Sequence, residues 1–261
     1  MSRSDNLVSV LDRVDSILDV VATDGPTTLT EIAHATGLPR TTVHRLLEQM
    51  VARRWLLRIN KSYEIGVRPF QLGSVARQGH WFYRLARPHL EDLRRRTRLI
   101  VHFGFLDGTS SVWWDRVGDA TLSEVPTVVG GRHPAYRTAS GKVLLAAEDP
   151  GYVERHFDAT FPRTTPNSLT TRDELAAVVE DVRNSGLAHD RGEFQATLGC
   201  VAAPITALTT TTSDGHHPTA SLSVCGPLEL FRREGPLASA VLTTSTAILK
   251  DVARHPVAEL D

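Results

Sequence analysis

The stretch LTEIAHATGLPRTTVHRLLE, residues 29–48, decides the fold of the N-terminal part of the chain. Its apolar positions have helical spacing on both sides of Gly37, and Pro39 occupies a favoured first-turn position in the second helix. Ala33, Gly37 and Val43 follow one another at intervals of four and six residues, which is the spacing of a helix-turn-helix. The tight turn of that motif needs a glycine, and its packed helices need a small residue. The stretch therefore predicts a helix-turn-helix.

The segments on both sides extend this motif. Residues 7–21 carry apolar side chains at helical spacing, which predicts a preceding helix that ends at Gly25-Pro26. Residues 55–59 and 62–65 read as two short strands that flank Asn60-Lys61, a two-residue turn. Three helices followed by a hairpin predict a winged helix-turn-helix.

The length of 261 residues is sufficient for two domains. We place a winged helix-turn-helix DNA-binding domain at residues 1–66 and a linker helix with an apolar stripe at residues 67–79. Residues 80–261 then form an effector-binding and oligomerisation domain.

The exposed face of the recognition helix is polar. If Val43, Leu46 and Leu47 are buried, the side chains that face outward are Arg40, Thr41, Thr42, His44 and Arg45. The wing would add Arg58 and Lys61 close to the DNA backbone or minor groove. Residues 39–79 carry a net charge of +6, although the whole chain carries −1. These features predict a double-stranded DNA operator as partner, and the alternative is a winged helix that binds proteins.

Composition argues against several other classes of protein. No apolar run approaches the ~20 residues needed to span a bilayer, and the first residues do not resemble a signal peptide. We therefore expect a cytoplasmic protein with no membrane partner. The two cysteines are too few for a disulfide framework or a cysteine-based zinc site. The histidines, including His216-His217 beside the polar loop 209–215, lack metal-binding spacing, so we expect neither a metal nor another cofactor.

The second domain alternates strands and helices. Strands are predicted over residues 99–106, 111–117, 201–206 and 220–225, and helices begin at Thr138, at the capping box 171–174 and at Pro236. This order fits an α+β domain with an antiparallel or mixed sheet. Trp113 and Trp114 are adjacent on a predicted strand, so one should face the core and the other the outside or a groove.

An enzyme is the main alternative from another functional class. Cys200 could act as a nucleophile with a distant histidine as its base, because such pairs are adjacent in space and not in sequence. No G-x-S-x-G, P-loop or G-x-G-x-x-G motif occurs in a supporting context. We therefore predict no catalytic residues, and the remaining alternative is an interaction module that does not bind DNA.

Separated blocks of sequence resemble the IclR family of bacterial transcriptional regulators. In chain order, the blocks are TEIA (residues 30–33) with TTVHRLL (41–47), YEIG (63–66), HPAYRTASGKVLLA (133–146), DRGE (190–193), GCVAAPI (199–205) and ASLSVCGP (220–227). Their number and order make the resemblance specific, and it runs over nearly the whole chain.

The resemblance implies a winged helix joined by a linker helix to a GAF-like effector-binding domain in a homodimer or tetramer. Members of the family bind small organic acids or aromatic metabolites, so a small-molecule effector, in particular a carboxylate, is the expected second partner. Carried onto this sequence, the effector site comprises Ala139, Ser140, Asp190, Cys200, Ser223 and Cys225. The family more often has serine where this chain has Cys225.

The chemistry of these residues agrees with an acidic effector. Ala139 and Ser140 lie at a helix start, where backbone N–H groups and the helix dipole favour a carboxylate. Ser223 and Cys225 alternate on a strand and so face the same side. Cys200 also has a simpler interpretation, as a small buried hydrophobic residue. The sequence leaves open the effector, the operator, and whether the regulator activates or represses.

Overall fold

The computed structural model describes residues 9–118, 125–206, 219–232 and 235–254. Leu7 at the start of the first predicted helix, the polar loop 209–215 and His216-His217 lie outside the described residues. The chain divides into two compact units after Gly79, and each is described by itself. Among the described residues, no helix has the length and apolarity that a membrane span requires.

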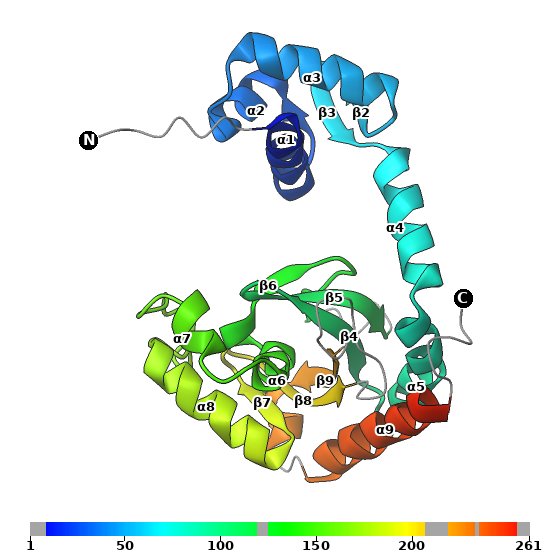
Figure 1. Ribbon diagram of the computed structural model, residues 1–261, viewed down its shortest axis with the longest axis vertical. Helices are drawn as coiled ribbons and strands as arrows, with labels where there is room; N and C mark the ends of the chain where they lie inside the picture. Colours follow the sequence, from blue (N-terminus) through cyan, green and yellow to red (C-terminus); the bar gives the residue numbers. More distant parts are fainter. Residues whose placement is uncertain (1–8, 119–124, 207–218, 233–234, 255–261) are drawn as a thin grey trace. The chain divides into compact units, whose positions relative to one another are not determined.

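The N-terminal unit is a winged helix-turn-helix (Figure 1). Its elements are α1 (Val10–Asp24), β1 (Thr27–Thr28), α2 (Leu29–Thr36), α3 (Arg40–Ala52), β2 (Leu56–Ile59), β3 (Ser62–Ile65) and α4 (Val67–Gly79). Capping boxes at Ser9 and Thr28 start α1 and α2, and Gly37 ends α2 with a left-handed φ of 67°. The predicted helix-turn-helix and hairpin are confirmed. The two-residue strand β1 was not predicted, and it pairs with β3 in a sheet of order β1-β3-β2.

The core of this unit follows the predicted periodicity. Ile17 and Val21 of α1, Ile32 of α2, and the buried positions of α3 pack together with Leu56 and Tyr63 of the wing. In α3 the buried residues are Val43, Leu46, Leu47 and Met50. The opposite face of α3 is therefore left to solvent.

The C-terminal unit is an α+β domain around one antiparallel sheet (Figure 1). Its helices are α5 (Trp81–Thr97), α6 (Ala139–Ala147), α7 (Tyr152–His156), α8 (Arg172–Ser185) and α9 (Gly235–Arg254), with short 3₁₀ turns at Ala135–Arg137 and Leu228–Phe231. Its strands are β4 (Ile100–Asp107), β5 (Ser110–Val117), β6 (Arg132–Pro134), β7 (Ala188–Arg191), β8 (Leu198–Thr206) and β9 (Thr219–Pro227). The six strands follow the order β6-β5-β4-β9-β8-β7, and every neighbouring pair is antiparallel.

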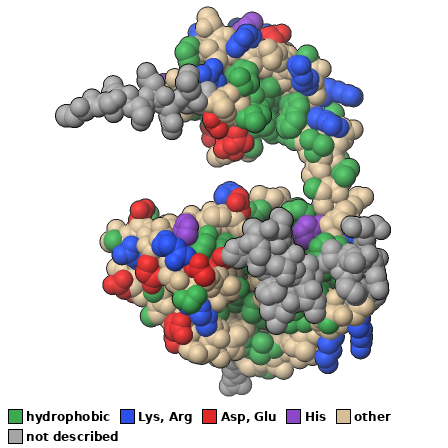
Figure 2. All heavy atoms as spheres, viewed as in Figure 1, with side chains coloured by type: hydrophobic (Ala, Val, Ile, Leu, Met, Phe, Trp, Pro, Cys, Tyr) green, Lys and Arg blue, Asp and Glu red, His purple; other side chains and the backbone are tan. Residues whose placement is uncertain are grey.

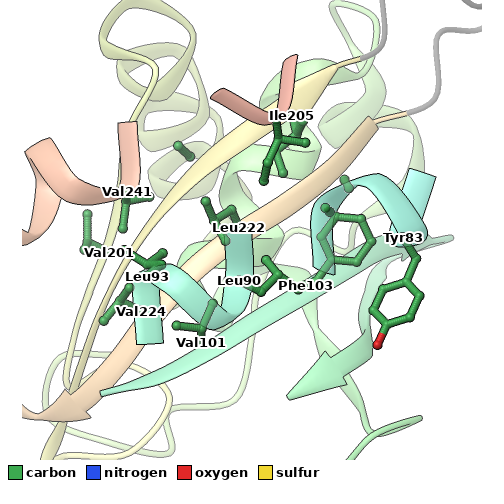
Figure 3. Packing of buried hydrophobic residues seen from close by; sticks show 14 of the residues in the cluster. Tyr83, Leu90, Leu93, Val101, Phe103, Val201, Ile205, Leu222, Val224 and Val241 are labelled. Carbon is green, nitrogen blue, oxygen red and sulfur yellow. The ribbon is translucent and has the colours of Figure 1, made fainter. Parts of the chain in front are cut away.

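Alternation along the strands gives the two faces of the sheet different chemistry. Val101, Leu222 and Val201 belong to the apolar face, which packs against α5 and α9 (Figure 3). His102, Ser223 and Cys200 point the other way, towards the side covered by α6. The α6 side of the sheet therefore buries the group of polar side chains that forms the candidate effector site.

A close backbone approach fixes the start of α6. A Cβ atom at Gly141 would lie 2.2 Å from the carbonyl oxygen and 2.4 Å from the Cα atom of Ala135. Only glycine allows α6 to begin this close to the preceding turn. The contact holds the first turn of α6 against the polar face of the sheet.

An irregularity in β4–β5 pairing separates the two adjacent tryptophans. Phe103 pairs with Asp115 and Gly104 pairs with Trp113, so Trp114 is the extra residue of a bulge. Trp113 is buried on the α6 side, whereas Trp114 packs against the apolar cluster on the other face. Each tryptophan therefore faces a different side of the sheet, as their adjacency predicts.

Candidate DNA interface and effector pocket

The outer face of α3 is polar and accessible. Arg40, Thr41, His44 and Arg45 are exposed and Thr42 is partly exposed, all within the first two turns. Pro39 precedes the helix and makes no side-chain cap, so the first N–H groups of α3 remain available at its start. The arrangement offers positive charge and a helix N-terminus at one place, which suits a polyanion.

The two predicted DNA-contact residues of the wing have different surroundings. Lys61 is exposed at the tip of the hairpin, beside Asn60, whose positive φ of 56° makes the turn. Arg58 forms an ion pair of 3.3 Å with Glu48 of α3 and lies over the ring of Tyr63. Arg58 therefore also joins the wing to the recognition helix. Figure 2 shows basic side chains over the part of this unit that contains α3 and the β2–β3 hairpin.

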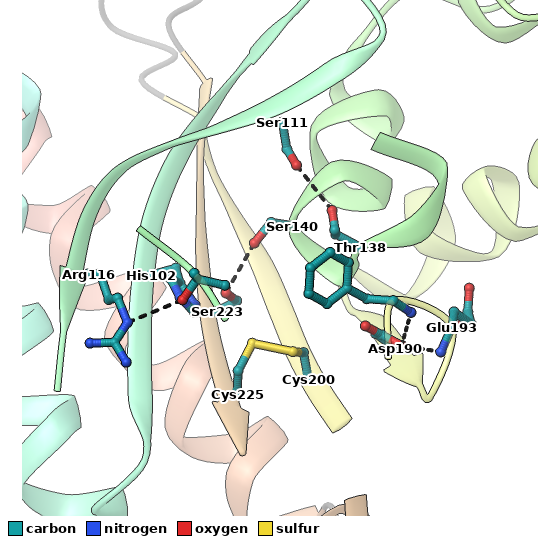
Figure 4. The surroundings of a disulfide bond; sticks show 12 residues. His102, Ser111, Arg116, Thr138, Ser140, Asp190, Glu193, Cys200, Ser223 and Cys225 are labelled. Atoms are coloured by element: carbon teal, nitrogen blue, oxygen red, sulfur yellow. Dashed lines mark hydrogen bonds between the residues drawn. A yellow bond between two sulfur atoms is a disulfide. The ribbon is translucent and has the colours of Figure 1, made fainter. Parts of the chain in front are cut away.

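A pocket lies between α6 and the polar face of the sheet in the C-terminal unit (Figure 4). All six predicted effector residues line it: Ala139, Ser140, Asp190, Cys200, Ser223 and Cys225. The lining residues that sequence analysis missed are Trp113, Val125, Thr127, Thr138, Phe194 and Leu198. The space that these residues enclose in this state has room for about one water molecule, so a ligand must be small and must displace some of their side chains.

The first turn of α6 forms one wall. The Thr138 hydroxyl accepts a hydrogen bond from the Gly141 N–H at 2.9 Å. The N–H groups of Ala139 and Ser140 have no partner inside the helix, because they belong to its first turn. The Ser140 hydroxyl donates to the Ser223 hydroxyl of β9 at 3.0 Å. Because Ser223 accepts this bond, its own hydrogen can be donated to a ligand.

Asp190 forms the acidic end of the pocket. Its Oδ1 atom accepts hydrogen bonds from the backbone N–H groups of Glu193, at 2.7 Å, and Phe194, at 3.3 Å. Its Oδ2 atom is buried and has no hydrogen-bond partner among the described residues. Burial raises the pKa of Asp190 to about 6, against the opposing effect of the two N–H donors. Asp190 therefore keeps one acceptor atom for a donor that a ligand could bring.

A buried ion pair holds the loop that binds Asp190. The Lys142 ammonium donates to the Glu193 carboxylate and to the His189 carbonyl oxygen, at 2.5 and 2.8 Å. Lys142 is 2% exposed, so the pair fixes the loop that follows β7 onto α6. The loop in turn places the two N–H groups that hold Asp190.

A second polar group lies on the β4–β5 side of the pocket. The His102 ring nitrogen Nε2 is 2.8 Å from the Thr127 hydroxyl, which also accepts a hydrogen bond from Arg116 Nε at 3.2 Å. Burial, with the nearby charge of Arg116, lowers the pKa of His102 to about 3. His102 is therefore neutral near pH 7, and it stacks on Trp113 with ring centroids 4.9 Å apart. No sequence motif marks this group, because strand pairing alone assembles it.

Aromatic side chains form the remaining wall. Trp113 lies 4.2 Å from His133 and 6.2 Å from Phe194, measured between ring centroids. The Arg137 guanidinium lies over Phe194 at 5.6 Å and donates to its carbonyl oxygen. The buried Trp113 Nε1–H has no acceptor within the described part of the chain. The wall thus combines a flat apolar surface with one unused donor.

The state of the two cysteines differs from the prediction. Cys200 and Cys225 form a disulfide bond between β8 and β9, so neither is the thiol that we expected (Figure 4). The alternative of Cys200 as a nucleophile is wrong for this state, whereas its interpretation as a small buried residue agrees with its 8% exposure in an apolar cluster. The residues are 25 positions apart, and only the register of β8 against β9 brings them opposite each other.

Comparison with known families identifies both units. Residues 10–58 match the IclR helix-turn-helix domain. Residues 78–254 match the family described as bacterial transcriptional regulator IclR C-terminal. The two matches together extend over nearly all of the described residues.

Individual relatives agree with these matches. The HTH-type transcriptional regulator KdgR of Escherichia coli is 29% identical over 204 residues, which are 77% of this chain and 77% of that protein. The crystal structure of a transcriptional regulator from Rhodococcus sp. RHA1 has 28% identity and a TM-score of 0.74, covering 94% of this chain and 98% of that one. An IclR homologue from Microbacterium hydrocarbonoxydans, crystallised with 4-hydroxybenzoate, has 24% identity and a TM-score of 0.79, covering 94% and 100%.

Proposed function

Because the chain belongs to the IclR family and is a DNA-binding transcriptional regulator, we propose that its pocket binds a small hydroxylated aromatic acid as effector. One observation carries this proposal. A buried carboxylate oxygen without a partner among the described residues, Asp190 Oδ2, shares a small pocket with the N-terminal turn of α6. A ligand that suits both needs an anionic end and a hydrogen-bond donor.

Electrostatics favour one orientation of such a ligand. Its carboxylate would accept hydrogen bonds from the Ala139 and Ser140 N–H groups and from the Ser223 hydroxyl. Its hydroxyl would donate to Asp190 Oδ2, and the ring between them would lie against Trp113. An anion close to the Asp190 carboxylate costs Coulomb energy, so the two acidic groups should lie at opposite ends of the pocket.

The ligand of one relative has this pair of groups. The Microbacterium hydrocarbonoxydans homologue was crystallised with 4-hydroxybenzoate, which carries a carboxylate and a hydroxyl on one ring. This compound is therefore the first probe for the present chain. The proposal itself rests on the residues of this pocket.

The DNA side of the proposal rests on α3 and the wing. Arg40, Thr41, Thr42, His44 and Arg45 would contact bases and phosphates, and Arg58 and Lys61 would contact the backbone. The linker helix α4 leaves Phe70 and Val75 72% and 71% exposed, and burial of this stripe against a second copy would pair two winged helices. A homodimer or tetramer could then read two half-sites.

Effector binding changes DNA affinity without any chemical step. The ligand has only to bind one arrangement of the paired chains more tightly than another. We therefore propose a cytoplasmic sensor without catalytic activity.

Calorimetry on the full chain tests the effector class. The first probe, 4-hydroxybenzoate, has both a carboxylate and a hydroxyl. Benzoate has only the carboxylate, and 4-hydroxybenzyl alcohol has only hydroxyls. We expect 4-hydroxybenzoate to bind the parent most tightly and Asp190→Asn to remove its advantage over benzoate, because the ionised acceptor is lost. Asp181→Asn, which changes an exposed carboxylate on α8, is the matched control.

Gel-shift assays with the DNA upstream of the regulator's own gene complete the test. Asp190→Asn should retain operator binding and lose the response to the acid. If all three probes bind equally, or if both aspartate variants behave alike, the effector lies elsewhere or belongs to another class.

A further inference from the structure

The disulfide belongs to a row of residues that crosses the polar face of the sheet. Asp190 of β7 pairs with Cys200 of β8, Cys200 pairs with Cys225 of β9, and Cys225 pairs with Ile100 of β4. Paired residues on antiparallel strands place their side chains side by side on one face. Both sulfur atoms therefore lie in the pocket wall, and the acceptor at Asp190 is the neighbour of one of them (Figure 4).

We propose that Cys200 and Cys225 form a reversible dithiol–disulfide pair through which hydroperoxides control the effector pocket. The first part, the redox pair, stands on the strand register alone. The second part, control of the effector, rests on the function proposed above. A serine in place of Cys225 would leave Cys200 without a partner.

The reaction balances with hydrogen peroxide as the oxidant. The Cys225 thiolate attacks one peroxide oxygen, the O–O bond breaks, and a sulfenic acid and water form. The Cys200 thiol then displaces water from the sulfenic acid and closes the disulfide. In sum, two thiols and one peroxide give one disulfide and two waters. A dithiol reverses the change by two exchanges and is itself oxidised to a disulfide.

The surroundings determine which cysteine reacts first. The carboxylate of Asp190 stands beside Cys200, and a neighbouring negative charge disfavours the thiolate that attacks peroxide. Cys225 has the apolar Ile100 on its other side. The two side chains are 8% and 5% exposed, in a pocket that admits only a small oxidant. Cys225 is therefore the residue whose thiolate attacks peroxide, and Cys200 is the residue that resolves the sulfenic acid.

Reduction of the disulfide should weaken effector binding in two ways. The Cys200 thiol becomes a donor beside Asp190 Oδ2 and competes with the ligand hydroxyl for that oxygen. The two sulfur atoms also move apart, from about 2 Å in a bond to roughly 3.5–4 Å in van der Waals contact, which takes space from the ligand. The disulfide form should therefore bind a hydroxylated acid more tightly than the dithiol form.

Thiol labelling on the full chain tests the redox pair without any effector. The chain contains only two cysteines, so alkylation followed by mass spectrometry assigns every product. We expect both thiols to be labelled after dithiothreitol, neither after one equivalent of peroxide, and both again after renewed reduction. In Cys200→Ser the sulfenic acid should accumulate on Cys225 and react with dimedone, whereas Cys225→Ser should react more slowly. Thiols that remain open to alkylation after peroxide, or the opposite order of reactivity, would overturn the proposal.

Calorimetry with 4-hydroxybenzoate tests control of the pocket. The parent should bind the acid roughly three- to tenfold more weakly in dithiothreitol than after peroxide, which is the effect of one competing hydrogen bond. Cys225→Ser should bind equally under both conditions. Equal affinities of the two parent forms would contradict control of the pocket by the pair. If neither form binds the acid, the proposed effector class is wrong, and reversible closure in the labelling experiment still supports the redox pair.

Discussion

The starts of α3 and α6 use the same backbone chemistry in opposite surroundings. Each presents N–H groups that the helix itself does not use, together with the positive end of the helix dipole. At α3 the neighbouring side chains are exposed, and Arg40 and Arg45 add positive charge. At α6 the first residues are buried, and the charged side chain among the described residues that line the pocket is the acid Asp190.

This difference decides what each helix start can bind. An exposed, basic helix start favours a polyanion whose charges remain partly in water, and the attraction depends strongly on salt. A buried helix start with one acid opposite admits a single small anion, provided that the ligand satisfies the acid as well. The surroundings, and not the helix end, therefore distinguish the DNA interface from the effector pocket.

The largest effect that we expect is on stability, and it comes from a side chain placed at Gly141, where α6 contacts Ala135. Gly141→Ala should destabilise the C-terminal unit by about 3 kcal/mol or more, because the new Cβ would overlap backbone atoms of Ala135. Urea unfolding followed by tryptophan fluorescence measures this loss. Gly73→Ala is the control, since a Cβ there has no atom within 4 Å among the described residues. Equal stability of both variants would show that α6 can start further from the turn.

The next effect concerns the basic helix start. Arg40→Ala and Arg45→Ala should each weaken operator binding by about 1–3 kcal/mol with little change in folding. Arg53→Ala removes the same charge just beyond the far end of α3 and should cost much less. Fluorescence anisotropy with labelled operator DNA gives the three affinities. Parent-like binding by both α3 variants would mean that another surface reads the operator.

The pH dependence of effector binding tests the acidic end of the pocket. Burial raises the pKa of Asp190 to about 6, and we expect the ligand hydroxyl to prefer the ionised form. Affinity for 4-hydroxybenzoate should be full above pH 7 and fall by roughly tenfold towards pH 5 as Asp190 takes up a proton. The ionisable neighbours that share this environment are Lys142 and Glu193. A pH profile that Asp190→Asn leaves unchanged would assign the titration to another group.

The two units also differ in how far the sequence alone predicts them. The winged helix is specified by local signals, namely the apolar period of α3, the capping boxes and the glycine at Gly37. We predicted no element for α5, which contains the helix breaker Pro88 although its apolar residues recur at helical spacing. We also predicted none for β7, which is only four residues long. Both elements owe their conformation to packing against the sheet.

The same limit applies inside the pocket. Ser223 and Cys225 could be placed on one face because alternation along a strand is local. The contact between His102 and Thr127, and the disulfide, depend on segments joined only in the folded state. Trp113 could not be assigned to the pocket either, since a bulge decides which of two adjacent tryptophans faces it.

A smaller effect should follow from the loss of one hydroxyl. Ser223→Ala removes the partner of Ser140 and one donor to the ligand carboxylate, and we expect about 1 kcal/mol weaker binding of 4-hydroxybenzoate. Operator binding without effector should be unchanged. Calorimetry supplies the first quantity and a gel shift the second. An unchanged affinity would place the carboxylate away from β9.

Salt dependence separates the two helix starts most directly, and its effect on binding of the acid is the smallest that we expect. Between 50 and 200 mM salt, operator affinity should fall by more than about tenfold, because binding releases counterions from DNA. Over the same range the affinity for 4-hydroxybenzoate should change by less than about twofold, since buried charges are screened weakly. Both affinities can be measured on one preparation in the same buffers, with calorimetry for the acid and anisotropy for DNA. If the affinity for the acid falls as steeply as that for DNA, its carboxylate is bound at an exposed basic surface. The first turn of α6 would then have no role in binding the effector.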